Sequence, residues 1–119
     1  MRPHEKLDVW KKGIDFTVEI YRATEVFPKE EKFGLTSQLR RAAVSIPSNI
    51  AEGAARTSNK EFLHFLSIAQ GSASEVATQL LIASRLGYIA KDEYRNFYLQ
   101  VDDLGRMLTG LAKHLKQKE

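Results

Sequence analysis

Apolar residues recur along the chain at steps of three and four, and this spacing places them on one face of an α-helix. The first such segment covers residues 5–26 and ends at Phe27-Pro28. It carries two apolar stripes side by side: one of Leu7, Trp10, Ile14, Val18 and Tyr21, and another of Val9, Phe16, Ile20 and Phe27. Two stripes cover more of a helix than the core of a monomeric bundle needs, so this helix predicts a second buried contact.

The second apolar segment, over residues 33–55, contains a proline in its interior. Its stripe keeps its phase across Pro47 and consists of Leu35, Leu39, Ala42, Ala43, Ile46, Ile50 and Ala54. A proline inside a helix costs about 3 kcal/mol and leaves one carbonyl without its donor. Because a true break would reset the helical rotation, the unbroken phase predicts one helix bent at Pro47 rather than two helices. The freed carbonyl is that of Ala43, and we expect a serine hydroxyl or a water molecule to bond to it.

Two further helices are predicted over residues 59–86 and 91–116. Ser58 and Glu61 stand at the spacing of a capping box, and Gly87 follows the third helix at the position that favours glycine. The fourth helix begins with Asp92 and Glu93, acidic groups that suit the positive end of a helix dipole. Four amphipathic helices with short connections predict an all-α, up-down-up-down antiparallel four-helix bundle, in a single domain over residues 1–119.

Composition narrows the class of protein further. The 119 residues include no cysteine, which excludes disulfides and thiolate metal sites, and 43% of them are hydrophobic, enough for one core. No apolar stretch approaches the ~20 residues that cross a bilayer, and the start, with Glu5 and Asp8, does not resemble a signal peptide. We therefore expect a cytoplasmic protein without a membrane partner. A net charge of +3 permits nucleic-acid binding but does not require it.

No arrangement of residues in the sequence indicates catalysis. Glu61 and His64 have the spacing used by di-iron bundles, but such sites need a second pair of this kind and two further glutamates. A nucleophile needs an activating base, and no serine has a histidine at a recognisable spacing. Gly71, Gly105 and Gly110 lie inside helical segments and cannot form a phosphate-binding loop. The sequence therefore predicts no enzyme activity, no catalytic residues, no metal site and no cofactor.

Basic residues are the remaining candidates for function. Because cationic side chains bind phosphates, seven of them are candidate nucleic-acid contacts: Lys11, Lys12, Arg22, Arg40, Arg41, Arg56 and Lys60. A basic tail follows in the fourth helix, with Lys113, His114, Lys116 and Lys118. The alternative interpretation is that these residues form only a solvated face.

A polar stripe in the second helix has the same period, and it consists of Arg41, Ser45, Ser48, Glu52 and Arg56. Its hydroxyl groups, with Asn49 beside them, could bond to another helix or to another copy of the chain. Alternatively, the contacts are internal, with Glu52 paired to Arg56 one turn later and the serines bonded to their own carbonyls.

A resemblance to a known family rests on residues 34–56, which read GLTSQLRRAAVSIPSNIAEGAAR. This segment resembles the signature of the small four-helix proteins encoded in intervening sequences of 23S ribosomal RNA genes. The likeness covers nearly the whole chain and includes LDVWKKGIDFTVEIYRAT near the start and EFLHFLSIAQGSASEVATQLLIASRLGYI in the third helix. These proteins are similar to accessory proteins of diversity-generating retroelements, whose basic pentameric barrels bind nucleic acid and a reverse transcriptase. The resemblance therefore implies a homo-oligomeric ring, typically a homopentamer.

The resemblance also implies roles for particular residues. It favours Arg40, Arg41 and Arg56 as basic contacts, and it implies a structural or oligomerisation motif made of Ser45, Pro47, Ser48, Asn49, Glu52 and Gly53. Two functions remain open. A ring of five copies would carry a charge of about +15 and could bind RNA or DNA through repeated basic side chains. Alternatively, the protein is a scaffold for protein–protein interaction without a nucleic-acid role.

Overall fold

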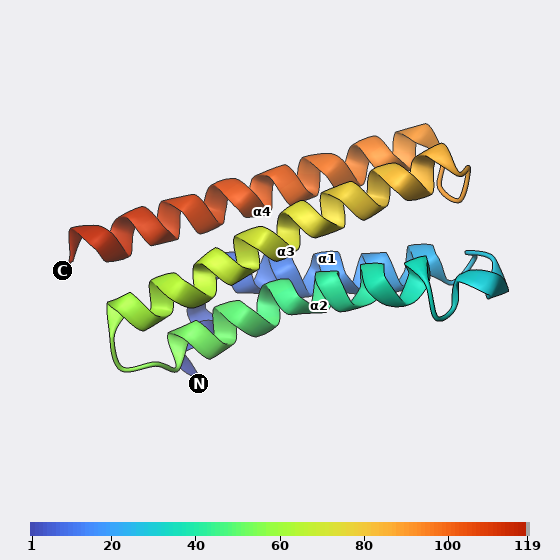
Figure 1. Cartoon of the computed structure of the whole chain (residues 1–119). Coiled ribbons are helices and arrows are strands. Elements are labelled where there is room, and N and C mark those ends of the chain that lie inside the picture. The colour runs from blue at the N-terminus through green and yellow to red at the C-terminus, as the bar shows by residue number, and fades with distance from the viewer. Residues whose placement is uncertain (119) are drawn as a thin grey trace.

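The computed structural model describes residues 1–118 and shows four α-helices, with no strand in that range. The helices are α1 (Asp8–Thr24), α2 (Leu35–Ala54), α3 (Asn59–Arg85) and α4 (Lys91–Gln117), and each runs opposite to the one before it (Figure 1). They form a rod of 46 × 22 × 21 Å. The predicted all-α fold with four helices is therefore confirmed. The end of the predicted domain, residue 119, lies outside the described residues.

The first two helices begin later than the apolar pattern predicts. Pro3–Lys6 forms a short 3₁₀ turn, and Leu7 is extended (φ −85°, ψ 123°), so α1 starts at Asp8 rather than at residue 5. Gly34 has a non-helical backbone (φ −111°, ψ −117°), which delays the start of α2 to Leu35 instead of residue 33. An apolar period locates the middle of a helix better than its ends, where the first turn is often 3₁₀ and the boundary shifts by one or two residues. The helices α3 and α4 begin at residues 59 and 91, as predicted.

The ends of α3 have the predicted caps, with one difference. The Ser58 hydroxyl accepts the backbone N–H of Glu61 (3.2 Å), and Gly87 takes a left-handed conformation (φ 79°) after the last turn. The Glu61 carboxylate accepts a bond from the Ser58 hydroxyl (3.1 Å). A full capping box would instead bring this carboxylate to the Ser58 backbone N–H. Ser58 is still the N-cap of α3, because its hydroxyl accepts a backbone N–H of the first turn that has no acceptor within the helix.

The core lies mainly between α2 and α3, which share the most extensive contact of any two helices. Its largest fully buried side chains come from all four helices: Phe16, Ile20, Leu39, Ile46, Ile50, Leu66, Val76, Leu80, Leu104 and Leu108. From α1, the core takes the stripe that contains Phe16 and Ile20. Of the other stripe, Leu7 and Trp10 pack partly against the core, whereas Ile14, Val18 and Tyr21 are 38%, 42% and 42% exposed. The chain therefore does not itself cover one apolar face of α1.

Pro47 lies inside a continuous α2, which confirms one helix rather than two. Its ring is buried against α1 at Gly13, where an added Cβ would lie 3.4 Å from the Pro47 Cβ. The carbonyl of Ala43, which loses its usual donor, lies 3.1 Å from the Thr17 hydroxyl of α1. That hydroxyl also lies 2.7 Å from the Gly13 carbonyl, so its single proton is shared between two acceptors. The compensating group is thus a threonine of the neighbouring helix, not the predicted serine or water.

Candidate nucleic-acid interface

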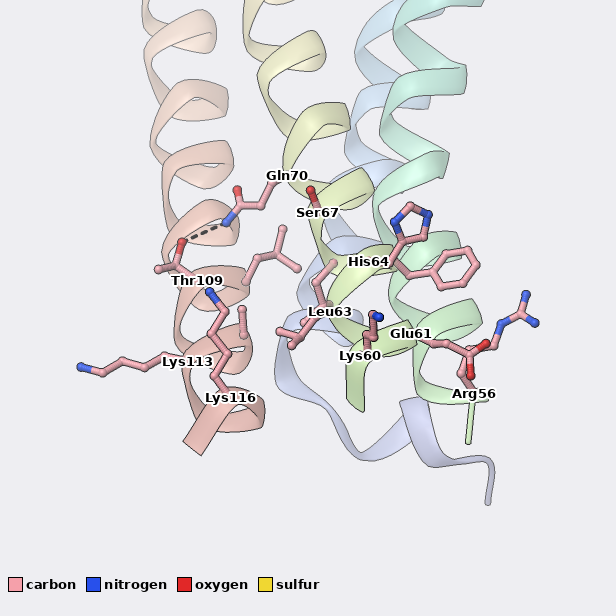
Figure 2. A pocket seen from close by; sticks show the side chains of 14 residues that line it. Arg56, Lys60, Glu61, Leu63, His64, Ser67, Gln70, Thr109, Lys113 and Lys116 are labelled. Carbon is pink, nitrogen blue, oxygen red and sulfur yellow. Dashed lines mark hydrogen bonds between the residues drawn. The ribbon is translucent and has the colours of Figure 1, made fainter. Parts of the chain in front are cut away.

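A groove between α3 and α4 gathers basic side chains at one end of the bundle (Figure 2). Its volume is about 1000 Å³, and leucine and alanine side chains from both helices form an apolar floor that includes Leu63 and Ala112. Four cationic side chains line it, from the α2–α3 connection, from α3 and from α4: Arg56, Lys60, Lys113 and Lys116. We call this feature the basic groove.

Two hydrogen-bonded clasps mark the ends of the basic groove. At one end the Asn59 side-chain amide donates to the Leu115 carbonyl (3.3 Å). At the other end the Gln70 amide donates to the Gly105 carbonyl (2.8 Å) and to the Thr109 hydroxyl (2.9 Å), the second of which is drawn in Figure 2. Because eleven residues of α3 separate the two clasps, the groove is about 16 Å long. The clasps hold the two helices at a fixed spacing on either side of the floor.

The basic groove carries as much net charge as the whole chain. Its lining includes four lysine and arginine side chains and one carboxylate, Glu61, which gives 4 − 1 = +3; the chain as a whole is also +3. Both α2 and α4 end here, and cations are favourable at the C-terminal end of a helix. All four cations are exposed to solvent, and Lys60, Lys113 and Lys116 make no ion pair within residues 1–118.

The seven basic residues predicted to contact nucleic acid do not lie on one surface. Arg56 and Lys60 lie in the basic groove, where the Arg56 guanidinium also pairs with Glu52 (3.5 Å) and lies 4.9 Å from the centre of the Phe65 ring. The pair Glu52–Arg56 is the internal contact that the polar stripe left open. Lys11, Arg22 and Arg41 are exposed on α1 and α2, away from the groove, and make no ion pair within residues 1–118.

Arg40 serves the bundle itself. Its Nε donates to the Thr24 hydroxyl (2.7 Å), and one terminal nitrogen donates to the Tyr21 carbonyl (3.1 Å). The guanidinium carbon lies 4.7 Å from the centre of the Tyr21 ring. Arg40 therefore caps the C-terminal end of α1, where carbonyl groups have no helical donor. Its candidacy as a nucleic-acid contact is not supported by this geometry, because the guanidinium is engaged within the chain.

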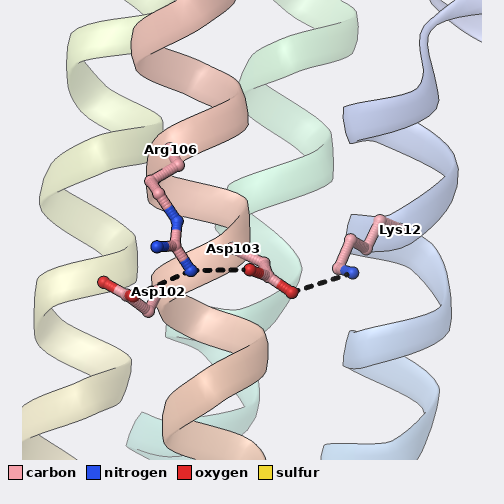
Figure 3. A network of polar contacts seen from close by, with 4 residues as sticks. All are labelled: Lys12, Asp102, Asp103 and Arg106. Atoms are coloured by element: carbon pink, nitrogen blue, oxygen red, sulfur yellow. Dashed lines mark hydrogen bonds and ion pairs between the residues drawn. The ribbon is translucent and has the colours of Figure 1, made fainter.

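Lys12 is engaged in an ionic network between α1 and α4 (Figure 3). Its ammonium group lies 3.4 Å from the Asp103 carboxylate, which also accepts a bond from Arg106 (2.9 Å). Arg106 reaches Asp102 as well, at 3.1 Å. The hydrogen bond from Arg106, and then that from Lys12, holds the pKa of Asp103 below its ordinary value. Asp103 in turn raises the pKa of Arg106.

In the sequence, Lys113 and Lys116 belong to the basic tail, and no local pattern marks them as groove residues. Their partners in the groove, Arg56 and Lys60, are 53 to 60 residues away along the chain. A signal for this proximity does exist, because antiparallel α3 and α4 must bring the end of one beside the start of the other.

The predicted oligomerisation motif packs mostly within the chain. The Ser45 hydroxyl accepts bonds from Ser72 of α3 and from the Asn49 amide, both at 2.8 Å. A Cβ at Gly53 would lie 2.8 Å from atoms of two phenylalanine side chains of α3. With Pro47 buried against α1, only Ser48 and Glu52 of the motif are well exposed. Most of this segment therefore joins α2 to its own neighbours.

The described residues contain no group of three or more His, Cys, Asp or Glu side chains placed to hold a metal ion. Within the same range, none of the helices combines the length and the apolar character that a membrane span requires.

Fold and site together define a small helical bundle with a cationic groove. The chain belongs to the family of 23S rRNA-intervening sequence proteins, whose sequence profile matches residues 5–110. It is similar to the crystal structure of a protein of unknown function from the S23 ribosomal protein family of Bacteroides thetaiotaomicron VPI-5482. The two share 26% sequence identity and a TM-score of 0.79, over 88% of this chain and 98% of the other. No curated protein matches the chain. The predicted family is thereby confirmed.

Proposed function

We propose that the chain is a non-enzymatic, ring-forming protein that binds RNA or DNA in the cytoplasm through the basic groove of each copy. The observation that supports nucleic-acid binding most directly is the charge of that groove, +3 over a length of about 16 Å. Cations that neutralise phosphates release counterions, and the affinity grows with the number of phosphates neutralised. The cations lie on both walls, so a polyanion in the groove would contact α3 and α4 together.

Self-assembly is supported by the outward face of α1, formed by Ile14, Val18 and Tyr21. Beside this face a shallow groove lies between α1 and α2, and it is lined by Trp10 and Ile14 of α1 and by Val44 of α2. Exposed apolar faces of this kind mark protein contacts. We propose a homopentamer, the assembly that the resemblance implies. A ring would repeat the basic groove around its circumference, and a nucleic acid that reaches several copies would gain avidity.

The ring is tested by the mass of the protein in solution. One chain has a mass of 13.5 kDa, and light scattering should report about five times that value for a closed ring. The variant Val18→Glu places a charge on the outward face of α1 and should lower the mass. The variant Thr78→Glu, at an exposed position of α3, should leave it unchanged. A wild-type mass equal to one chain at micromolar concentration contradicts the proposal.

Nucleic-acid binding is tested by fluorescence anisotropy with a short labelled RNA over a series of salt concentrations. The double variant Lys113→Gln/Lys116→Gln removes two cations from the basic groove, and the slope of log K against log salt should fall by about 1.4 for a single strand. The control Lys29→Gln/Lys32→Gln makes the same change of net charge in the α1–α2 connection, at the other end of the bundle, and should change the slope far less. Equal losses in the two variants, or no binding at low salt, would refute the proposed site.

A protein-interaction role is the second candidate, and one observation favours it. Val26 and Phe33, in the connection between α1 and α2, are 81% and 88% exposed. Large apolar side chains so fully in solvent are suited to a protein partner. A partner that stays bound after nuclease treatment, and is lost in Phe33→Ser, would support this role over nucleic-acid binding.

A further inference from the structure

The basic groove has two chemically different halves. Arg56, Lys60 and Lys116 lie near the clasp between Asn59 and Leu115, so cations dominate that half. Toward the opposite clasp the lining is neutral and polar, with Ser67, Gln70 and Thr109 (Figure 2). The apolar floor lies between them. A ligand that fits this arrangement has an anionic group, a flat apolar surface and an edge that forms hydrogen bonds.

We propose that the groove holds unpaired nucleotides, with phosphates on the cationic half and bases on the apolar floor. This inference rests on the proposed function and specifies which form of nucleic acid the groove selects. In a duplex the base faces are stacked and hidden, so a duplex would contact only the rim and leave the floor in water. In a single strand the bases can leave the stack, cover the floor and present their edges to the hydroxyl and amide groups.

The rim of the groove also offers a surface for stacking. His64 and Phe65 both line the groove, with their rings edge-on and 5.5 Å between the ring centres. Since the Arg56 guanidinium lies over the Phe65 ring, the stacking surface is that of the exposed His64 ring. Aromatic rings are the usual platforms for unstacked bases, at about 1–3 kcal/mol per base. A fatty acid or another simple amphiphile would need only one cation at one end. Cations on both walls fit better with a ligand that carries several charges along its length.

The test compares one short RNA strand, free and annealed to its complement, on the assembled protein. We expect the single strand to bind about tenfold or more tightly than the duplex. The variant Ala112→Phe fills the floor without changing any charge and should abolish this preference. The matched control is Ala77→Phe, in the neighbouring groove between the same two helices, where the charged lining consists of Asp102 and Arg106. This control should keep the preference.

The possible results separate the inference from the proposed function. Equal binding of single strand and duplex, with Ala112→Phe behaving as wild type, overturns the inference and leaves nucleic-acid binding intact. Binding of neither form at low salt overturns both. If Ala112→Phe abolishes the binding of oleate or of an acidic amphipathic peptide but not that of RNA, the groove serves that other ligand and the inference is wrong.

Photocrosslinking gives a second measurement that does not depend on a variant. A single strand that contains 4-thiouridine should crosslink to wild-type protein within residues 60–70 or 108–116. Crosslinks confined to other segments would contradict the inference even if Ala112→Phe failed to fold.

Discussion

The contact between Thr17 and the Ala43 carbonyl makes a sharp prediction about the proline in α2. A proline at position 47 has no N–H to donate to Ala43, and the structure supplies the Thr17 hydroxyl at 3.1 Å instead. Thr17→Val keeps the shape of the side chain and removes that donor. In the wild-type background the Ala43 carbonyl, on a fully buried residue, would then have no partner.

The expected magnitude depends on the residue at position 47. An unsatisfied buried carbonyl costs about 1–3 kcal/mol, so Thr17→Val should lower the free energy of unfolding by that amount when Pro47 is present. In Pro47→Ala the new backbone N–H can donate to Ala43, and the same threonine change should cost well under 1 kcal/mol. The two changes should therefore be coupled by about 1–2 kcal/mol. The effect of Pro47→Ala alone has opposing parts, because the helix regains a bond while the ring contact with Gly13 is lost.

The assay is urea unfolding of the wild type, both single variants and the double variant at one protein concentration, since association shifts apparent stability. A coupling of this size moves the midpoint of Thr17→Val by about 0.5–1 M more in the proline background than in the alanine background. If Thr17→Val costs the same in both backgrounds, the hydroxyl does not compensate for the proline and this account of α2 is wrong.

Two further predictions concern the glycines and the ionic network. Gly53→Ala should lower the free energy of unfolding by about 1–3 kcal/mol, because the added methyl group overpacks against α3. At Gly71 no atom lies within 4 Å of an added Cβ, so Gly71→Ala should raise the free energy of unfolding by about 0.5–1 kcal/mol. Thermal melts in which both variants shift the melting temperature the same way contradict this prediction. Because the folded pKa of Asp103 is depressed, its stabilising effect is present above the ordinary carboxyl pKa and is lost as the pH falls through the lower folded value. Asp103→Asn should therefore cost more stability at pH 7 than at pH 2 when urea unfolding is measured at both pH values, and an equal cost at the two pH values contradicts this account.

The apolar period was sufficient to predict the helices because helical burial repeats every three to four residues. The doubled stripe of α1 also predicts a second buried contact; within the single chain Val18 is exposed, and the contact itself stays a prediction. The apolar period did not predict where α1 and α2 begin. Leu7 and Gly34 have non-helical backbone angles, and hydrophobicity carries no information about such angles. The partner of the Ala43 carbonyl was missed for a related reason, since it comes from a different helix.

The candidate site was harder to predict, because it depends on which basic residues meet in space. Arginine and lysine are common on any solvated face. The sequence does not distinguish a cation that caps a helix from one that is available to bind a ligand. Arg40 turned out to cap α1 and Lys12 to bridge α1 and α4. Only the pairing of α3 with α4 brings Lys60 beside Lys116, and that pairing follows from topology rather than from local composition.

The two surfaces that carry the proposals lie on different helix pairs, and this separation has a consequence for function. The outward face of α1 extends toward α2, whereas the basic groove lies between α3 and α4. Copies that associate through α1 would leave both walls of the groove open, so assembly and ligand binding need not compete for the same side chains. The Val18→Glu variant should then lose avidity for a long RNA strand while each separated chain keeps its affinity for a short one. If short-strand binding disappears together with the ring, the groove is completed by a neighbouring copy and the two surfaces are not independent.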